Sequence, residues 1–234
     1  MAYAGLFKVW ATVLAAILVA VLLFTASTTG AEAQDADCTG QVVLDAGHGG
    51  TDSGAVNTEY DPTTENEQTI TEKEQTLKVA NKTKELLEKK GYRVCKTRTS
   101  NSETLSNNDR YTYANTTGAE VLVSIHMNGA SNPSADYTTT LFGKWRKDKE
   151  LANTIFTSLS TLPAADGAGK IATRTPYSFA SGVLLKSNMP ATIAETVFIT
   201  SDREAQLLSN GTGARQQQIA EALEVGIERY LARP

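Results

Sequence analysis

The chain has 234 residues, of which 41% are hydrophobic and 21% are charged, and its formal net charge is -4 at pH 7. This length is sufficient for one domain with a full-sized core and leaves little room for another. Because the charge balance is acidic, there is no basic face on which a phosphate backbone could release its counterions, and the composition argues against a nucleic-acid partner.

The first 33 residues have the pattern of a secretory signal peptide. Lys8 supplies a positive charge, residues 9–24 are almost wholly apolar, and Ala31-Glu32-Ala33 fits a small-x-small cleavage site. We therefore predict export to the periplasm or the outside of the cell, with cleavage after Ala33. An uncleaved membrane anchor is the alternative, since the apolar run is only slightly shorter than the roughly 20 residues that a spanning helix needs.

The chain contains two cysteines, and both bear on the compartment. Export would place Cys38 and Cys95 where thiols can be oxidised, so one disulfide between them is an open alternative. The other alternative is a free Cys95, which lies in a predicted buried strand, where a cysteine behaves as a small hydrophobe. Lipid modification of Cys38 is disfavoured, because Asp35 and Asp37 stand where small apolar residues would be expected.

A polar joint at 34–40 precedes one predicted domain at 41–234, in which strands alternate with helices. Thr71 with Glu74 fits a capping box, Gly91 fits a helix end, and residues 51–70 are expected to be a polar loop without a core element. The alternation predicts an α/β fold: a single domain with an open, mostly parallel twisted sheet and helices on both faces. Strands are expected at 42–44, 92–97, 121–125, 137–142, 182–186 and 192–197, and helices at 71–90, 106–116, 149–162 and 212–231.

The two histidines of the chain, His48 and His126, each follow an apolar predicted strand. Ligands bind at the carboxyl edge of open parallel sheets. A lone histidine is more often structural than a ligand, but two at equivalent strand ends favour a shared metal site. A carboxylate would complete the His₂Glu set of a hydrolytic zinc ion. Position alone does not separate Glu72 from Glu74, although Glu74 also has a use in the capping box.

Glu195 interrupts the apolar run of the predicted strand at 192–197. Charged residues are seldom buried unless they are paired or functional. A hydrolytic zinc site needs a group that takes a proton from water and passes it to the departing amine, and Glu195 is the candidate. The alternative is a structural ion pair between Glu195 and a neighbouring lysine or arginine.

Four segments of the chain contain the candidate residues. They are Leu44-Asp45-Ala46-Gly47-His48-Gly49-Gly50, Glu72-Lys73-Glu74-Gln75-Thr76-Leu77, Ser124-Ile125-His126-Met127-Asn128, and Met189-Pro190-Ala191 through Glu195-Thr196-Val197-Phe198. Together these segments resemble the zinc-dependent N-acetylmuramoyl-L-alanine amidases, and their order and spacing agree with that family from about Gln41 to the C-terminus.

The resemblance implies a role for each candidate residue. One zinc ion per chain is expected on His48, Glu72 and His126, with Glu195 as the catalytic glutamate. Arg110 is expected to support the structure, and Asn128 and Lys186 to contact substrate. The family commonly has an arginine where Lys186 stands and an asparagine where Ser201 stands. Because lysine lacks the guanidinium fork, substrate contacts near Lys186 are expected to differ.

The implied reaction is hydrolysis of the amide that joins the lactyl group of N-acetylmuramic acid to the L-alanine of the stem peptide. The expected partners are peptidoglycan or its muropeptide fragments, with an activator protein as an additional, unidentified partner, and the enzyme is expected to be a monomer. One alternative is a carboxypeptidase of the stem peptide, which would need a cation for the terminal carboxylate. Another is an inactive wall-binding protein, which would not need a general base such as Glu195.

Overall fold

The computed structural model describes residues 38–61, 66–144 and 146–233. The predicted signal peptide, its cleavage site and most of the joint at 34–40 lie outside these ranges. Within them, each helix is too short or too polar to cross a membrane.

A six-stranded sheet forms the centre of the described part of the chain, with strand order β4-β1-β5-β8-β6-β7. All neighbouring pairs are parallel except β6 and β8, which are antiparallel. Every residue of β1 is buried, which explains its continuous apolar run, since a strand covered on both faces needs no polar alternation. The strands are β1 (Val42–Ala46), β4 (Val94–Lys96), β5 (Val121–Asn128), β6 (Thr139–Phe142), β7 (Tyr177–Ser178) and β8 (Ala191–Phe198).

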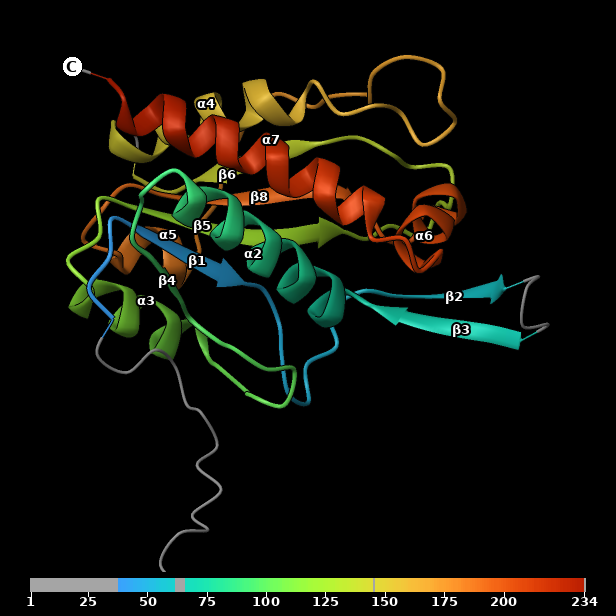
Figure 1. Ribbon diagram of the computed structural model, residues 1–234, viewed down its shortest axis with the longest axis horizontal. Helices are drawn as coiled ribbons and strands as arrows, with labels where there is room; N and C mark the ends of the chain where they lie inside the picture. Colours follow the sequence, from blue (N-terminus) through green and yellow to red (C-terminus); the bar gives the residue numbers. More distant parts are fainter. Residues whose placement is uncertain (1–37, 62–65, 145, 234) are drawn as a thin grey trace, which may run out of the picture. The chain divides into compact units, whose positions relative to one another are not determined.

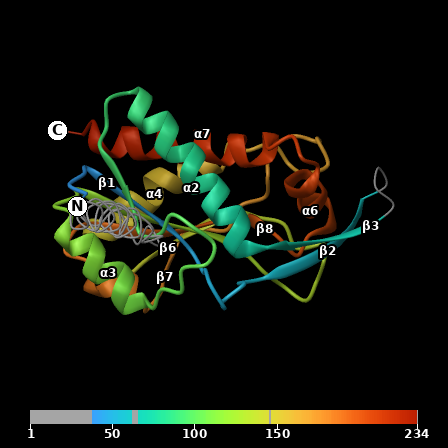
Figure 2. The same ribbon diagram turned by 60° about the horizontal axis from the view of Figure 1, so that its bottom comes forward.

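Helices cover both faces of the sheet, as Figures 1 and 2 show. One face packs against α2 (Glu72–Lys89), α4 (Lys147–Leu159) and α7 (Ala214–Leu231) in the larger core cluster. The other packs against α3 (Asn107–Thr116) and the short α5 (Gly182–Lys186). The predicted α/β fold with a mostly parallel sheet is confirmed.

Two predicted features of the helices can be compared with the structure directly. Gly91 ends α2 as expected: its φ is 89°, and its N–H donates to the Glu88 carbonyl. The predicted capping box at the start of α2 is wrong, because the Thr71 side chain makes no capping hydrogen bond. The backbone N–H groups of Glu72 and Lys73 instead donate to the carbonyls of Ala55 and Ser53. A further helix, α6 (Asp202–Ser209), was not predicted.

The expected polar loop at 51–70 contains a β-hairpin. β2 (Val56–Asp61) and β3 (Asn66–Thr71) form an antiparallel sheet of their own, separate from the central sheet (Figure 1). Ile70 is 4% exposed and belongs to the larger core cluster. The hairpin is formed mainly by backbone pairing of polar residues, so an analysis based on apolar residues misses it.

Two further expectations are corrected. Residues 182–186 form the helix α5 and not a strand, because a short apolar run does not distinguish a buried strand from a buried helical turn. His126 lies inside β5, which continues to Asn128, and not beyond the strand's end.

Cys38 and Cys95 form a disulfide, which decides between the two alternatives that the sequence left open.

Candidate metal centre

Three side chains that are far apart in the sequence converge at the carboxyl edge of the sheet. Glu72 Oε1 lies 3.0 Å from His48 Nε2 and 3.1 Å from His126 Nδ1, and the two histidine nitrogens are 3.2 Å apart. This trio could hold a metal ion. Glu74 is not part of the trio, so the geometry separates it from Glu72, as position in the sequence could not.

The loop after β1 reaches this arrangement through an unusual backbone. Among the described residues, His48 is the one non-glycine residue with a positive φ, of 60°. Close approach also requires glycine at two positions. A Cβ on Gly47 would overlap the His126 ring, and a Cβ on Gly54 would lie 2.6 Å from both Glu72 Oε2 and His48 Cδ2.

Two buried arginines hold the carbonyls of the loop. Arg110 donates to the carbonyls of Ala46 and His48 at 2.8 Å each, and to Asp45 Oδ1 at 2.6 Å. Arg98 donates to the carbonyls of Ala46 and Gly47 at 2.9 and 3.0 Å. The supporting role expected of Arg110 stays a prediction, and these contacts are the ones through which it would act. Arg98 was not predicted, because nothing in the sequence distinguishes a buried arginine from a surface one.

Asp45 is fully buried between strands and is paired with Arg110. Burial alone would raise its pKa. The charge of Arg110 and the hydrogen bonds from Ser124, Thr97 and Arg110 lower that pKa below its ordinary value. Asp45 is therefore ionised at neutral pH and compensates the charge of Arg110.

Glu72 is 3% exposed and both of its oxygens are engaged. Oε1 accepts from the Met127 N–H and Oε2 from the Ala55 N–H, each at 2.9 Å. Burial alone would raise the pKa of Glu72, but hydrogen bonds and charge from His126 and His48 lower it well below its usual range. Its place in the first turn of α2 also favours a negative charge.

Asp52 contacts the far side of the His48 ring, with Oδ2 2.8 Å from Nδ1. Burial alone would lower the pKa of His48, but Glu72 and Asp52 raise it above its ordinary value. A carboxylate at this nitrogen fixes the tautomer, so that Nε2 is free to act as a ligand. Asp52 was not among the predicted residues. Its position four residues after His48 in the same glycine-rich loop is a signal that could have identified it.

Glu195 lies beside His126, because the two residues are paired in register on the parallel strands β8 and β5. Burial raises the pKa of Glu195 above its ordinary value, although the nearby His126 partly opposes this shift. Within the described ranges, no lysine or arginine forms an ion pair with Glu195. The alternative of a structural ion pair at Glu195 therefore finds no support among the described residues.

A pocket of about 350 Å³ opens over this edge on the α3 and α5 side of the sheet. His48, His126 and Glu195 line it, and Arg110 is the one lysine or arginine among the described residues of its lining. Neither of the predicted substrate contacts is in that lining. Lys186 is exposed at the end of α5, and Asn128 ends β5 with a buried Nδ2 that has no partner among the described residues.

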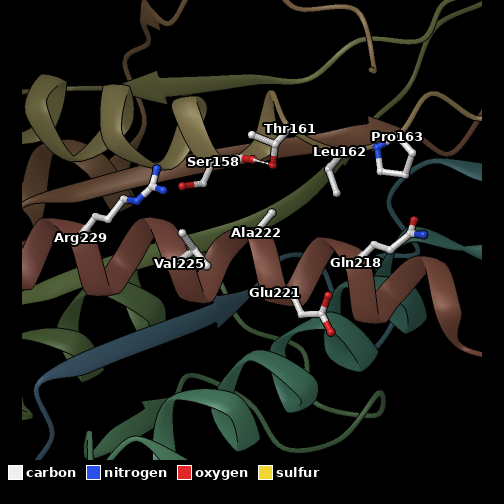
Figure 3. A pocket seen from close by; sticks show the side chains of 9 residues that line it. All are labelled: Ser158, Thr161, Leu162, Pro163, Gln218, Glu221, Ala222, Val225 and Arg229. Atoms are coloured by element: carbon white, nitrogen blue, oxygen red, sulfur yellow. Dashed lines mark hydrogen bonds between the residues drawn. The ribbon is translucent and has the colours of Figure 1, made fainter. Parts of the chain in front are cut away.

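A separate pocket lies between the end of α4 and α7 (Figure 3). Ser158, Thr161, Glu221 and Arg229 are among its lining residues. None of the predicted site residues is among the described residues that line it.

Comparison with known proteins adds a family match and several relatives. A family model described as N-acetylmuramoyl-L-alanine amidase matches residues 42–229. The protein named Probable cell wall amidase LytH from Staphylococcus epidermidis is 28% identical over 193 residues, which are 82% of this chain and 58% of LytH. The chain thus spans less than two thirds of the length of that relative.

Solved structures with the same fold include two clostridial amidases. The N-acetylmuramoyl-L-alanine amidase from Clostridium difficile 630 is 32% identical, with a TM-score of 0.67 over 83% of this chain and 97% of that one. The CwlD amidase from Clostridioides difficile, solved in complex with the GerS lipoprotein, is 27% identical, with a TM-score of 0.67 over 83% of this chain and 99% of that one.

Proposed function

The chain belongs to the N-acetylmuramoyl-L-alanine amidase family, and on that premise we propose that it is a zinc hydrolase of peptidoglycan. Its substrate is the amide between the lactyl group of N-acetylmuramic acid and the L-alanine of the stem peptide, and residues 41–234 form its catalytic domain. The observation that carries this proposal is the convergence of His48, Glu72 and His126 beside Glu195.

The three converging side chains suit zinc in kind and in spacing. Two histidines and one glutamate are the protein ligands of known hydrolytic zinc sites, in which a fourth position stays open. Ligand atoms bound tetrahedrally at such a zinc ion lie roughly 3.3 Å apart. The three separations here are 3.0, 3.1 and 3.2 Å. When bound, zinc supplies a Lewis acid for the scissile carbonyl and for the attacking water.

Glu195 is the proposed proton carrier of the reaction. It takes a proton from the attacking water and delivers it to the nitrogen of the leaving amine. The raised pKa of Glu195 suits this role, because proton transfer in both directions is most efficient when the pKa of the carrier is close to the working pH. A thiol nucleophile is absent from the described residues, since both cysteines are in the disulfide.

The lining of the pocket favours an amidase over a carboxypeptidase of the stem peptide. A carboxypeptidase needs a cation that is free to bind the terminal carboxylate. Among the described lining residues the one cation is Arg110, and it is already engaged by Asp45 and two backbone carbonyls. Mass analysis of muropeptide digests distinguishes the two activities: an amidase releases the intact stem peptide from the glycan, and a carboxypeptidase releases one amino acid.

Loss of activity with loss of metal tests the zinc assignment. We expect one zinc ion per chain in active protein, and removal by a chelator should abolish muropeptide cleavage until zinc is restored. Active protein that contains no zinc would contradict the proposal.

Export and partners complete the proposal. A disulfide is typical of oxidising compartments, and relatives named for the cell wall support a location outside the cytoplasm. We therefore propose that a signal peptide is cleaved after Ala33. N-terminal sequencing of protein recovered from outside the cytoplasm would test this. The CwlD complex with a lipoprotein supports an activator partner, and light scattering of the purified protein would test the proposed monomer.

A further inference from the structure

Two aromatic side chains stand exposed at the rim of the pocket that contains Glu195. Tyr177 is 37% exposed and Phe179 is 49% exposed, and both line that pocket. Large apolar side chains grouped beside a polar site mark a surface that contacts another molecule.

The backbone fixes both rings on the same side of the sheet edge. Tyr177 lies in β7, where it is paired with Leu141 of β6. The Phe179 N–H donates to the Phe142 carbonyl at 2.9 Å, which continues this pairing. Because residues two apart in an extended chain point to the same side, the two rings face the pocket together.

A neighbouring arginine side chain also fixes the position of the Tyr177 ring. The Arg174 guanidinium lies 4.8 Å from the centroid of the Tyr177 ring and donates to the Tyr137 hydroxyl at 3.3 Å. Burial raises the pKa of Tyr177, so its ring is uncharged at neutral pH. The ring is therefore a neutral surface that is in place before a ligand arrives.

An apolar row leads from Glu195 to these rings. Ile193, Leu141 and Tyr177 are paired in register across β8, β6 and β7, and all three line the pocket. Glu195 follows Ile193 by two residues and points to the same side. Two strand spacings separate β8 from β7, roughly 10 Å. A ligand at Glu195 that extends roughly 10 Å across the sheet in this direction reaches Tyr177.

The charges of the pocket indicate which half of the substrate lies there. Among the described lining residues Arg110 is the one lysine or arginine, and it is engaged by Asp45. This lining therefore offers no free side-chain cation to the carboxylates of a stem peptide. The N-acetylated sugar on the other side of the scissile amide is uncharged once its lactyl carboxyl is in the amide, and one face of its ring presents C–H groups that pack on an aromatic ring.

We propose, on the basis of the amidase function above, that Tyr177 and Phe179 form a saccharide platform, which binds the pyranose ring of the glycan on the acyl side of the scissile amide.

The exchanges Tyr177→Leu and Phe179→Leu test the platform, since leucine keeps apolar bulk and removes the flat ring. Tyr92→Leu is the matched control, because Tyr92 is a partly exposed tyrosine that lines a different pocket, beside Cys38. The probe is the uncharged disaccharide N,N′-diacetylchitobiose, which has the same N-acetylated pyranose rings, titrated into zinc-loaded protein by calorimetry. We expect the affinity to fall roughly two- to tenfold for each platform exchange and to stay unchanged for the control. Zinc content should not change in any of them.

Muropeptide cleavage by the same proteins separates this inference from the proposed function. If the unaltered enzyme cleaves muropeptide and both platform variants bind the disaccharide as tightly as it does, the platform is wrong and the amidase function stands. If the unaltered protein binds the disaccharide through the two rings but does not cleave muropeptide, the platform stands and the amidase function fails. Weaker binding of free stem peptide, with disaccharide binding unchanged, would assign the rings to the peptide and overturn the inference.

Discussion

The exchange Glu195→Gln removes a carboxylate from the pocket while it keeps the size of the side chain and its capacity for hydrogen bonds. If Glu195 carries the proton, turnover should fall by about 10² to 10⁴, the usual contribution of general acid-base catalysis. Zinc content should stay at the level of the unaltered enzyme, because Glu195 is not one of the three converging ligands.

The shifted pKa of Glu195 predicts whether this exchange raises or lowers the stability of the folded protein. Burial raises that pKa in the folded protein. A carboxyl with a raised folded-state pKa contributes stability below its unfolded pKa, and this contribution is lost as the pH rises through the folded-state pKa. Above its folded-state pKa, where it is ionised, Glu195 therefore disfavours the folded state of the metal-free protein. Glutamine removes this cost, so the metal-free variant should melt at the same temperature as the unaltered protein or higher.

A structural ion pair at Glu195 predicts the opposite sign. Breaking a buried pair costs about 3 to 5 kcal/mol. For a domain of roughly 200 residues, each kcal/mol shifts the melting temperature by about 2 to 4 °C, so the loss would be roughly 6 to 20 °C.

Melting in chelator at pH 7, followed by zinc reloading and muropeptide digestion of the same preparation, separates the two roles. Glu221→Gln, at an exposed position of α7, is the matched control and should leave melting and turnover unchanged. Near-normal turnover of Glu195→Gln would refute the proton-carrier role, and a fall in melting temperature within the ion-pair range would refute the reasoning on charge.

Three other predictions concern the ligand set and its support. Glu72→Ala should weaken zinc retention, measured by dialysis and metal analysis, whereas Glu74→Ala should not; the reverse result would mean that the wrong glutamate has been assigned. Asp52→Asn should lower zinc affinity about 10- to 100-fold in a competition assay with a chromogenic chelator, because it weakens the partner of His48 Nδ1, and unchanged affinity would remove Asp52 from the site. Arg110→Gln should lower the free energy of unfolding in urea by about 3 to 5 kcal/mol, since it leaves the buried Asp45 without its cation. Arg203→Gln, which breaks an exposed pair with Asp166, is the control and should cost less than about 1 kcal/mol.

The sequence predicted the layered α/β fold and the edge of the sheet at which the candidate site lies, because both follow from apolar runs that end at special residues. β1 and β5 each begin with an apolar run, and a histidine follows within a few residues, after the end of β1 and inside β5. Features that depend on backbone hydrogen bonds could not be predicted from apolar runs. The hairpin of β2 and β3 has few apolar residues, and the start of α2 is satisfied by the carbonyls of Ser53 and Ala55 rather than by a side chain.

The sequence also could not distinguish Glu72 from Glu74, because the difference between them depends on tertiary hydrogen bonds. Both lie in the first turn of α2, and the capping box that seemed to occupy Glu74 does not form. What distinguishes them is direction: the side chain of Glu72 points back to the loop after β1 and accepts hydrogen bonds from Ala55 and Met127. Those donors belong to two other elements, so tertiary contacts decide the matter. Only the family resemblance could supply that information in advance.

Hydrogen bonds within the protein hold the two histidines of the candidate metal centre in position. A positive φ at a non-glycine residue such as His48 costs free energy and persists only when its surroundings enforce it. Here Arg110 binds the His48 carbonyl, and Asp45 compensates the charge of Arg110. Asp45 is in turn fixed by Ser124, two residues before His126. Both histidines are thus tied to one buried aspartate, which explains how the sheet core sets the separation of two candidate ligands, one in the loop after β1 and the other in β5.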